Sequence, residues 1–192
     1  MDKHKQLLNF FFEVGQLKRI PRSGWVALGV KNPESVADHT ARSVFISFVI
    51  AKLEGADPYK ASLINAFHEL PETRVGDINR VGSRYLNKDE AEEKALKDQL
   101  NYIPEDIGAE FKKLISDFGK DTSKEQIIAR DADYLECAIQ GKEYIDQGFS
   151  YAQNWIDNSR KCVKTKTSKK FFDLLNKSNS QDWFNTLKKI KR

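Results

Sequence analysis

Apolar residues recur along most of this chain at intervals of three and four positions, the spacing of one face of an α-helix. Period-two alternation of apolar and polar residues, which would indicate β-strands, is absent. The pattern therefore predicts an all-α fold. No internal repeat and no second domain interrupts it. We expect a single domain over residues 1–192, with a core over about 5–147 and a C-terminal helical extension over 150–190.

The N-terminal segment is predicted to form a helix over about residues 5–18. The apolar and small residues on or near one face of this helix are Leu8, Phe11, Phe12 and Gly15. Proline and glycine between residues 19 and 25 disfavour a continuing helix, and Pro33 closes the loop that they predict. Loops of this kind often build binding sites.

Two capping boxes mark the starts of the two longest predicted helices. Ser35 and Asp38 start a helix that runs to about residue 53, which places His39 in its first turns. Thr122 and Glu125 start a helix that runs to about residue 147. Its expected core face includes Ile128, Ala132, Leu135 and Ile139, and Asp133 lies beside that face.

A third predicted helix begins at Asp57-Pro58, an N-cap followed by a first-position proline, and ends near Pro71. The residues expected to point inward are Leu63, Ile64 and Phe67. His68 and Glu69 therefore lie at the C-terminal end of this helix, and residues 72–78 are predicted to form a loop or short turn.

The remaining helices are marked by weaker signals. Asn87 with Glu90 caps a polar helix, and Pro104 opens the next one. Near the C-terminus, helices are predicted over about residues 151–163, 168–175 and 181–190. Their aromatic residues are expected to pack back onto the domain: Trp155, Phe171, Phe172, Trp183 and Phe184.

The composition is that of an ordinary folded domain, with 40% hydrophobic and 31% charged residues in 192. No apolar run approaches the roughly 18 residues of a membrane span, and the N-terminus lacks the features of a signal peptide, so we expect a cytoplasmic protein. Cys137 and Cys162 are too few for a disulfide framework and lack CxxC spacing, which favours reduced thiols.

Lysines cluster toward the C-terminus, although the net charge of +4 is modest. A basic tail can bind nucleic acid, which would make association strongly dependent on salt. These clusters are spread among apolar residues without an aromatic stacking pattern, so a solvated face of the last helices is favoured and nucleic acid is an unlikely partner.

The chemistry of the chain is suggested by histidines and acids in helical, mostly apolar sequence. His39, His68 with the adjacent Glu69, and the Asp131/Asp133 pair all lie in such stretches. A buried, unpaired carboxylate is costly, and a divalent ion would compensate all of these sites at once. Such an ion lowers the pKa of bound water from about 15.7 toward about 7 and polarises a phosphoryl oxygen.

Each of these residues also has a structural interpretation. Either histidine alone would more often be a hydrogen-bonded core residue. Glu69 could be an exposed acid at a helix end, and Asp133 could pair with Arg130 or Lys142. All of these interpretations must hold together for the metal hypothesis to fail.

The order of these residues resembles that of the HD-domain metal phosphohydrolases, and specifically of the HD-domain 5'-deoxynucleotidases. The motifs that carry the resemblance are residues 32–39, 68–72, 76–78 and 133–144, and the match covers roughly residues 18–144. Residues 18–26 and 85–91 also resemble archaeal and eukaryotic members of the family.

The resemblance implies a helical bundle around a divalent ion, which would be Mn, Co, Zn, Fe or Mg, and a homodimer. The implied metal ligands are His39, His68, Glu69 and Asp133.

The resemblance also implies residues that act on the substrate. Glu72 would orient or protonate the reacting groups, and Asp77 would contact the sugar 3'-hydroxyl. Trp25 would pack beside the deoxyribose, and Arg22, in preference to Arg19, would contact the phosphate. From the residues alone, Trp25 could equally be a core tryptophan and Asp77 a turn cap.

One departure concerns the acid after the second histidine, which is aspartate in the family and Glu69 here. The extra methylene can shift the ion or change which metal is preferred, and Pro71 suggests an altered local path. The leading hypothesis is a metal-dependent enzyme that releases phosphate from deoxyribonucleoside 5'-monophosphates. The alternative is a degenerate HD domain that binds nucleotide or metal with little or no hydrolysis.

Overall fold

The computed structural model describes residues 2–187, and over this range the regular structure is helical, as predicted. The α-helices are α1 (Lys3–Val14), α2 (Ser23–Ala27), α3 (Val36–Glu54), α4 (Pro58–Phe67), α5 (Glu72–Val75), α6 (Lys88–Leu100), α7 (Glu105–Ile115), α8 (Lys124–Asp146), α9 (Gln153–Cys162), α10 (Lys166–Leu175) and α11 (Asp182–Asn185). Short 3-10 turns cover Gly15–Lys18, Gly82–Arg84 and Ser150–Ala152.

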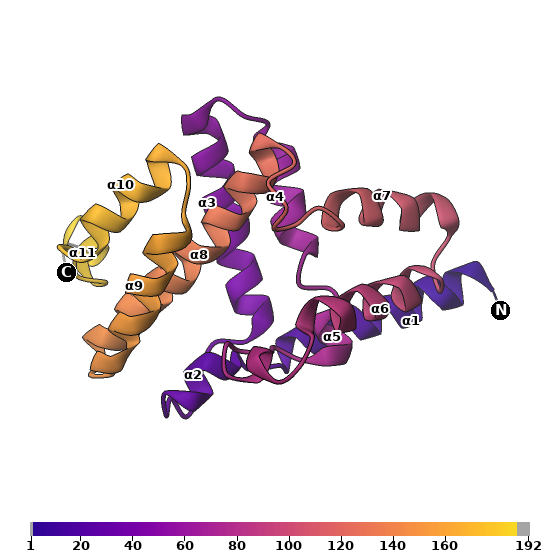
Figure 1. Ribbon diagram of the computed structural model, residues 1–192, viewed down its shortest axis with the longest axis horizontal. Helices are drawn as coiled ribbons and strands as arrows, with labels where there is room; N and C mark the ends of the chain where they lie inside the picture. Colours follow the sequence, from indigo (N-terminus) through magenta and orange to yellow (C-terminus); the bar gives the residue numbers. More distant parts are fainter. Residues whose placement is uncertain (1, 188–192) are drawn as a thin grey trace, which may run out of the picture.

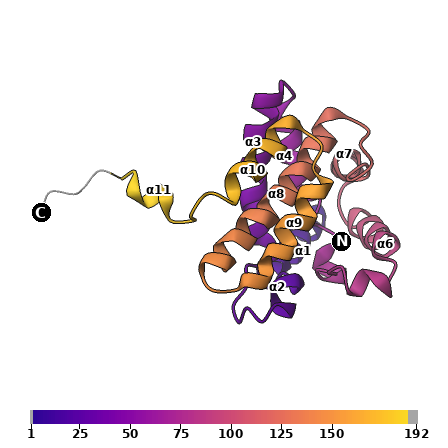
Figure 2. The ribbon, with the colours of Figure 1, turned by 60° about the vertical axis from the view of Figure 1, so that its left-hand side comes forward.

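Helices α3, α4 and α8 form the centre of the bundle, and α9 and α10 pack on α8 (Figures 1 and 2). Their shared core is apolar and fully or almost fully buried; it includes Ile50, Ala61, Ile128, Ala132, Leu135, Ile156 and Phe172. The buried amide of Asn65 on α4 connects the three central helices, since it donates hydrogen bonds to the Ala129 carbonyl (2.8 Å) and to the Ser47 hydroxyl. This bond network holds in register the three helices that carry the predicted metal ligands.

A second apolar cluster joins α1, α6 and α7, and here the predicted face of the first helix is wrong. Phe10 is buried there with Leu7 and Val14 packed around it, whereas Leu8, Phe11 and Phe12 are exposed. The reason is tertiary: Phe10 makes an edge contact with Phe111 of α7, at 5.7 Å between ring centroids, which turns the neighbouring face of Leu7, Phe10 and Val14 inward instead.

The helix starts follow the predicted capping chemistry, with one shift. The capping box of Ser35 and Asp38 is present, and Asp57 caps α4. Helix α8 is capped by Ser123, not by Thr122: the Ser123 hydroxyl accepts from the Gln126 backbone N–H at 3.2 Å, while Thr122 donates to Asp117. The predicted loop before residue 33 contains the short helix α2, and residues 72–75 form the single turn α5.

The C-terminal aromatic residues are only partly packed onto the domain. Phe172 is fully buried and Trp155 lies against Trp25, but Phe171, Trp183 and Phe184 are exposed, which contradicts the prediction for these three. Helix α11 lies away from the bundle in Figure 2, so Trp183 and Phe184 on this helix do not pack against the core. The predicted helix over 181–190 extends partly outside the described residues. The domain boundaries given above stay a prediction.

Among residues 2–187, no helix is both long enough and apolar enough to cross a membrane.

Two neighbouring residues of α4 test the packing. Ile64 is fully buried, whereas Leu63, predicted to point inward, is 44% exposed because it lies one helical step away from the α3–α8 contact. We expect Ile64→Ala to lower the free energy of unfolding by about 2–5 kcal/mol, since it leaves a cavity, and Leu63→Ala to lower it by less than about 1 kcal/mol. Urea denaturation of both variants measures this, and equal losses would contradict the assigned burial.

Candidate metal centre and active-site pocket

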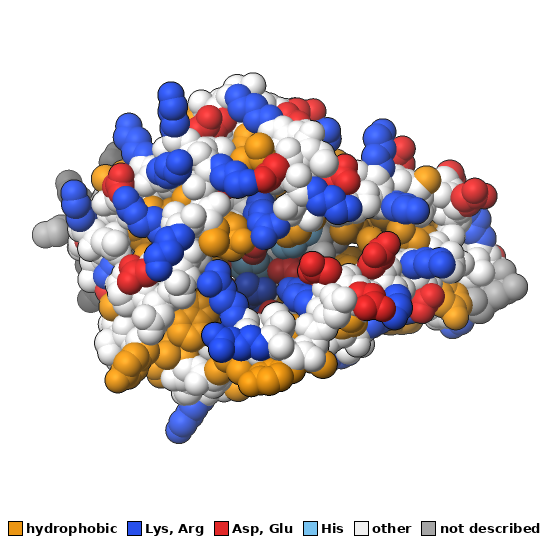
Figure 3. All heavy atoms as spheres, in the orientation of Figure 1, with side chains coloured by type: hydrophobic (Ala, Val, Ile, Leu, Met, Phe, Trp, Pro, Cys, Tyr) orange, Lys and Arg blue, Asp and Glu red, His pale blue; other side chains and the backbone are white. Residues whose placement is uncertain are grey.

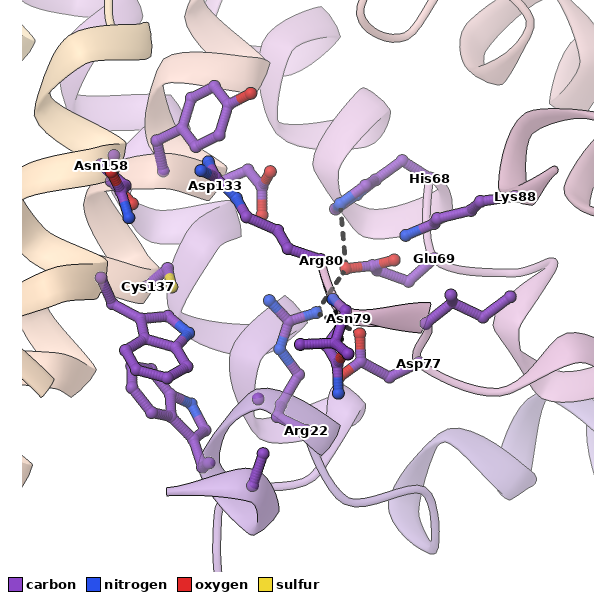
Figure 4. Close-up of a pocket in the computed structure, with 18 of the residues that line it drawn as sticks. Arg22, His68, Glu69, Asp77, Asn79, Arg80, Lys88, Asp133, Cys137 and Asn158 are labelled. Atoms are coloured by element: carbon purple, nitrogen blue, oxygen red, sulfur yellow. Dashed lines mark hydrogen bonds and ion pairs between the residues drawn. The ribbon is translucent and has the colours of Figure 1, made fainter. Parts of the chain in front are cut away.

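Four side chains from three helices converge at the centre of the bundle. His39 comes from the first turns of α3, His68 and Glu69 follow the last turn of α4, and Asp133 lies near the middle of α8. One nitrogen or oxygen of each lies within 4.8 Å of the others. The structure thus brings together the four residues that the sequence proposed as ligands. Figure 4 shows three of them, His68, Glu69 and Asp133, around one pocket.

Each histidine is oriented by a hydrogen bond at its Nδ1 atom. His39 Nδ1 bonds the carboxylate of Glu136, which is fully buried, and His68 Nδ1 donates to the Asn65 carbonyl at 3.0 Å. In both rings this leaves Nε2 facing the cluster. Histidine ligands of metals are commonly held in this way, because the second hydrogen bond fixes the tautomer and raises the basicity of the ring.

The cluster requires a positive charge. His39 Nε2 lies 2.9 Å from Asp133 Oδ1 and 3.5 Å from Glu69 Oε1. Although burial and Arg22 favour the neutral ring, the carboxylates of Glu136 and Asp133 raise the pKa of His39 to about 10. Despite their burial, Glu69 and Asp133 have lowered pKa values, Glu69 chiefly through the charge of His68 and Asp133 through its bond to His39.

A divalent cation fits this donor set. The buried Nε2 of His68 makes no hydrogen bond among the described residues and lies 3.3 Å from Glu69 Oε1, so a cation between the two atoms would be bound by both. A cation at the centre would take the place of the proton that His39 otherwise needs. Two imidazoles and two carboxylates from separate elements suit zinc, manganese, cobalt or iron and leave positions open for other ligands.

A second set of charged residues lies beside the cluster. The Nη1 atom of Arg22 is 3.3 Å from Glu69 Oε1 and 3.6 Å from Asp77 Oδ1, and Asp77 also accepts from the Ser23 backbone N–H at 2.5 Å. This network fixes Arg22 at the start of α2. Arg19, the alternative arginine, is exposed and does not line the pocket.

Glu72, at the start of α5, is buried with its Oε1 atom 3.3 Å from Lys88 Nζ. Burial and the negative charge of Glu69 raise the pKa of Glu72 to about 9, against the opposing effect of Lys88. Glu72 Oε2 has no hydrogen-bond partner among the described residues. The raised pKa favours the protonated form of Glu72, which would place a proton next to Glu69.

A cavity of about 490 Å³, a typical size for a small-molecule site, is lined by Arg22, His68, Glu69, Asp77, Lys88 and Asp133. The fully buried His39 and the almost fully buried Glu72 do not line it. In Figure 3 the hollow appears at the centre of the face, with pale blue histidine at its base and acidic and basic side chains around it. Trp25 contributes to the wall although it is 2% exposed. Its indole Nε1 donates to Glu34 at 2.8 Å, and its ring packs on Tyr144 and Trp155.

Comparison with known proteins identifies a family profile and named relatives that match most of this chain. A family profile described as "HD domain" matches residues 14–175. The human protein named 5'-deoxynucleotidase HDDC2 is 34% identical over 145 residues, which cover 74% of this chain and 70% of the human one. The chain belongs to the HD-domain 5'-deoxynucleotidase family.

Two solved structures share the fold of this chain. A conserved hypothetical protein from Pyrococcus furiosus superposes with a TM-score of 0.74 at 33% identity, over 89% of this chain and 99% of that one. A protein from Pyrococcus horikoshii superposes with a TM-score of 0.72 at 30% identity, over 88% of this chain and 96% of that one. The HD-domain match over residues 14–175 includes all four convergent side chains.

In this HD domain the two aspartates of α8 have separate surroundings. Asp133 faces the cluster and contacts neither Arg130, which bonds Tyr134, nor Lys142, which pairs with Asp146. Asp131 instead accepts hydrogen bonds from the Lys164 and Thr165 backbone N–H groups and from the Thr165 hydroxyl. It therefore holds the start of α10.

The sequence reasoning missed the residues that support the HD-domain cluster from behind. Glu136 and Arg42 lie three positions after Asp133 and His39 on the same helix faces, and Arg42 Nε donates to Glu136 Oε1 at 2.8 Å. Glu136 could have been predicted from helical spacing, because a residue three positions after Asp133 lies one turn away on the same face of the helix. Lys88 lies within residues 85–91, which resemble the family, but its position beside Glu72 is set by the fold and could not be predicted from that motif.

Glu136 provides a test of this support. We expect Glu136→Gln to weaken binding of a divalent ion roughly 10- to 100-fold, because His39 loses the negative charge that raises its basicity. Glu143→Gln is the matched control, since Glu143 also accepts from Arg42, at 2.7 Å, but does not touch His39. Calorimetric titration of both variants with Mn²⁺ or Zn²⁺ measures the affinities. Equal affinities in the two variants would contradict the role of Glu136.

Proposed function

We propose that this protein is a metal-dependent phosphohydrolase that releases inorganic phosphate from deoxyribonucleoside 5'-monophosphates. The observation that carries the proposal is the convergence of His39, His68, Glu69 and Asp133 beside a cavity with cationic side chains. The relatives named 5'-deoxynucleotidase support the choice of substrate.

The four convergent residues would hold the ion, and Mn, Co, Zn, Fe and Mg are the candidates. When bound, such an ion lowers the pKa of water toward neutrality and polarises a phosphoryl oxygen. Two histidine ligands favour the transition metals and zinc over Mg²⁺, which prefers oxygen ligands.

The chain's own residues supply phosphate binding and a proton. Arg22 lies next to Glu69 and can contact a phosphate through the guanidinium nitrogens that Glu69 and Asp77 leave available. Phosphoester hydrolysis adds water at phosphorus and breaks the bond to the 5'-oxygen, which must gain a proton as it leaves. The protonated carboxyl of Glu72 supplies that proton, and Lys88 at 3.3 Å stabilises the carboxylate that remains.

Trp25 and Asp77 would contact the sugar. Asp77 accepts a hydrogen bond from Ser23 and retains acceptor capacity for a 3'-hydroxyl. The ring of Trp25 is held by Glu34 and Trp155, so its edge in the pocket would be a rigid surface beside the deoxyribose.

The oligomeric state and the location of the protein stay predictions. A homodimer is consistent with an apolar strip on α3, where Phe45, Val49 and Leu53 are exposed at a spacing of one helical turn. The cytoplasmic location rests on the sequence features alone.

Phosphate release and metal content test the function together. We expect wild-type protein to bind about one divalent ion per chain and to release phosphate from 5'-monophosphates in preference to di- and triphosphates. His68→Ala should lose both metal and turnover, because it removes one of the proposed ligands. Metal and nucleotide binding without phosphate release would instead indicate the degenerate HD domain, and neither binding nor release would defeat the proposal.

Glu72→Gln tests the proton donor. Glutamine keeps the shape of the side chain but cannot supply the proton, so we expect kcat to fall by roughly 10²- to 10⁴-fold while the metal content stays that of wild type. Steady-state kinetics and elemental analysis on the same preparation measure both quantities. An unchanged kcat would remove Glu72 from the reaction.

A further inference from the structure

We propose that helix α9 carries a nucleobase-binding face made by Asn154, Trp155 and Asn158. This inference rests on the proposed function and adds to it the part of the substrate that the metal cluster does not contact. It also assigns a task to a helix outside the region that carries the sequence motifs.

The three residues form one face of the helix. Positions 154, 155 and 158 are spaced by one and four residues, which places their side chains on the same side, and all three line the cavity. Figure 4 shows Asn158 on one side of the pocket and Lys88 and Glu69 on the other. Helix α9 therefore builds the wall opposite the charged end.

The chemistry of this wall differs from that of the rest of the pocket. The charged end holds Arg22 and Lys88 with Glu69 and Asp77, whereas the side chains of the α9 face are neutral. A nucleoside 5'-monophosphate has the same polarity, with a charged phosphate at one end and a neutral heteroaromatic base at the other. With the phosphate at the metal cluster, the base would point toward α9.

The amide groups on this face are available to a ligand. Among the described residues, the side chains of Asn154 and Asn158 make no hydrogen bond. A carboxamide presents one acceptor and a paired donor, which matches the edges of the bases. Asp157, the charged neighbour on α9, does not line the cavity and instead accepts from Gln153 at 2.9 Å.

Trp155 supplies a flat surface for stacking. Its ring lies 5.2 Å from that of Trp25, with 34° between the planes, so one tryptophan supports the other. Gly24 permits this approach, because a Cβ atom there would come within 3.0 Å of Trp155 Nε1. Bases commonly stack on aromatic side chains, at about 1–3 kcal/mol per base.

The experiment compares substrates with and without a base. Phosphate release is measured from the deoxyadenosine, deoxyguanosine, deoxycytidine and thymidine 5'-monophosphates and from deoxyribose 5-phosphate. We expect Asn158→Ala to lower kcat/KM about tenfold for at least one nucleotide and to leave deoxyribose 5-phosphate unchanged. Asp157→Ala is the matched control and should change neither. An equal effect of Asn158→Ala on all five compounds, or none on any, would overturn the proposal.

A binding measurement keeps the inference separate from the proposed activity. Deoxyadenosine should quench the tryptophan fluorescence of wild-type protein and quench that of Trp155→Leu less. The Trp155→Phe variant keeps an aromatic ring at this position, so it should retain the affinity that Trp155→Leu loses. If wild-type protein released no phosphate from any compound, the proposed activity would fail, while deoxyadenosine binding that Asn158→Ala weakens would still support the base site. Absence of deoxyadenosine binding in wild-type protein would overturn it.

Discussion

The structure depends on one electrostatic constraint, the concentration of imidazole and carboxylate groups in a buried space. His39 contacts both Glu69 and Asp133 where little water can screen the charges, and Glu136 adds a further negative charge behind His39. Such a group of acids is tolerable only with compensating positive charge. Arg22 and Arg42 supply part of it from either side, and a proton or a metal ion between His39 and Asp133 supplies the rest.

The packing of the helices fixes where these charged side chains lie. Neutral hydrogen bonds of Asn65 hold α3, α4 and α8 together, so the side chains that each helix contributes meet at a fixed point. The end of α4 before Pro71 then turns the chain, which lets His68 and Glu69 both face the cluster and places Glu72 directly behind them. The extra methylene of Glu69 is used in this arrangement, because its carboxylate lies within 3.5 Å of both histidines and of Arg22.

Many helix starts and one long core face could be predicted from the sequence, because helix caps and apolar periodicity depend on residues close together in the chain. The starts of α3 and α4 and the core face of α8 follow directly from Ser35, Asp57 and the spacing of apolar residues. The face of α1 and the exposure of Leu63 could not be predicted, since both depend on which helix packs where. The same holds for Lys88 and for the α9 wall, whose positions beside the cluster are set by long-range packing and leave no pattern in the sequence.

The most direct measurement is the position of a bound divalent ion in crystals grown with Mn²⁺ or Zn²⁺, located by anomalous diffraction. We expect one strong peak per chain within about 2.0–2.3 Å of His39 Nε2, His68 Nε2 and an Asp133 oxygen, with Glu69 at or near coordinating distance. A well-ordered cluster without a peak, or a peak bound elsewhere while His39 keeps its contact with Asp133, would contradict the central role of the cation.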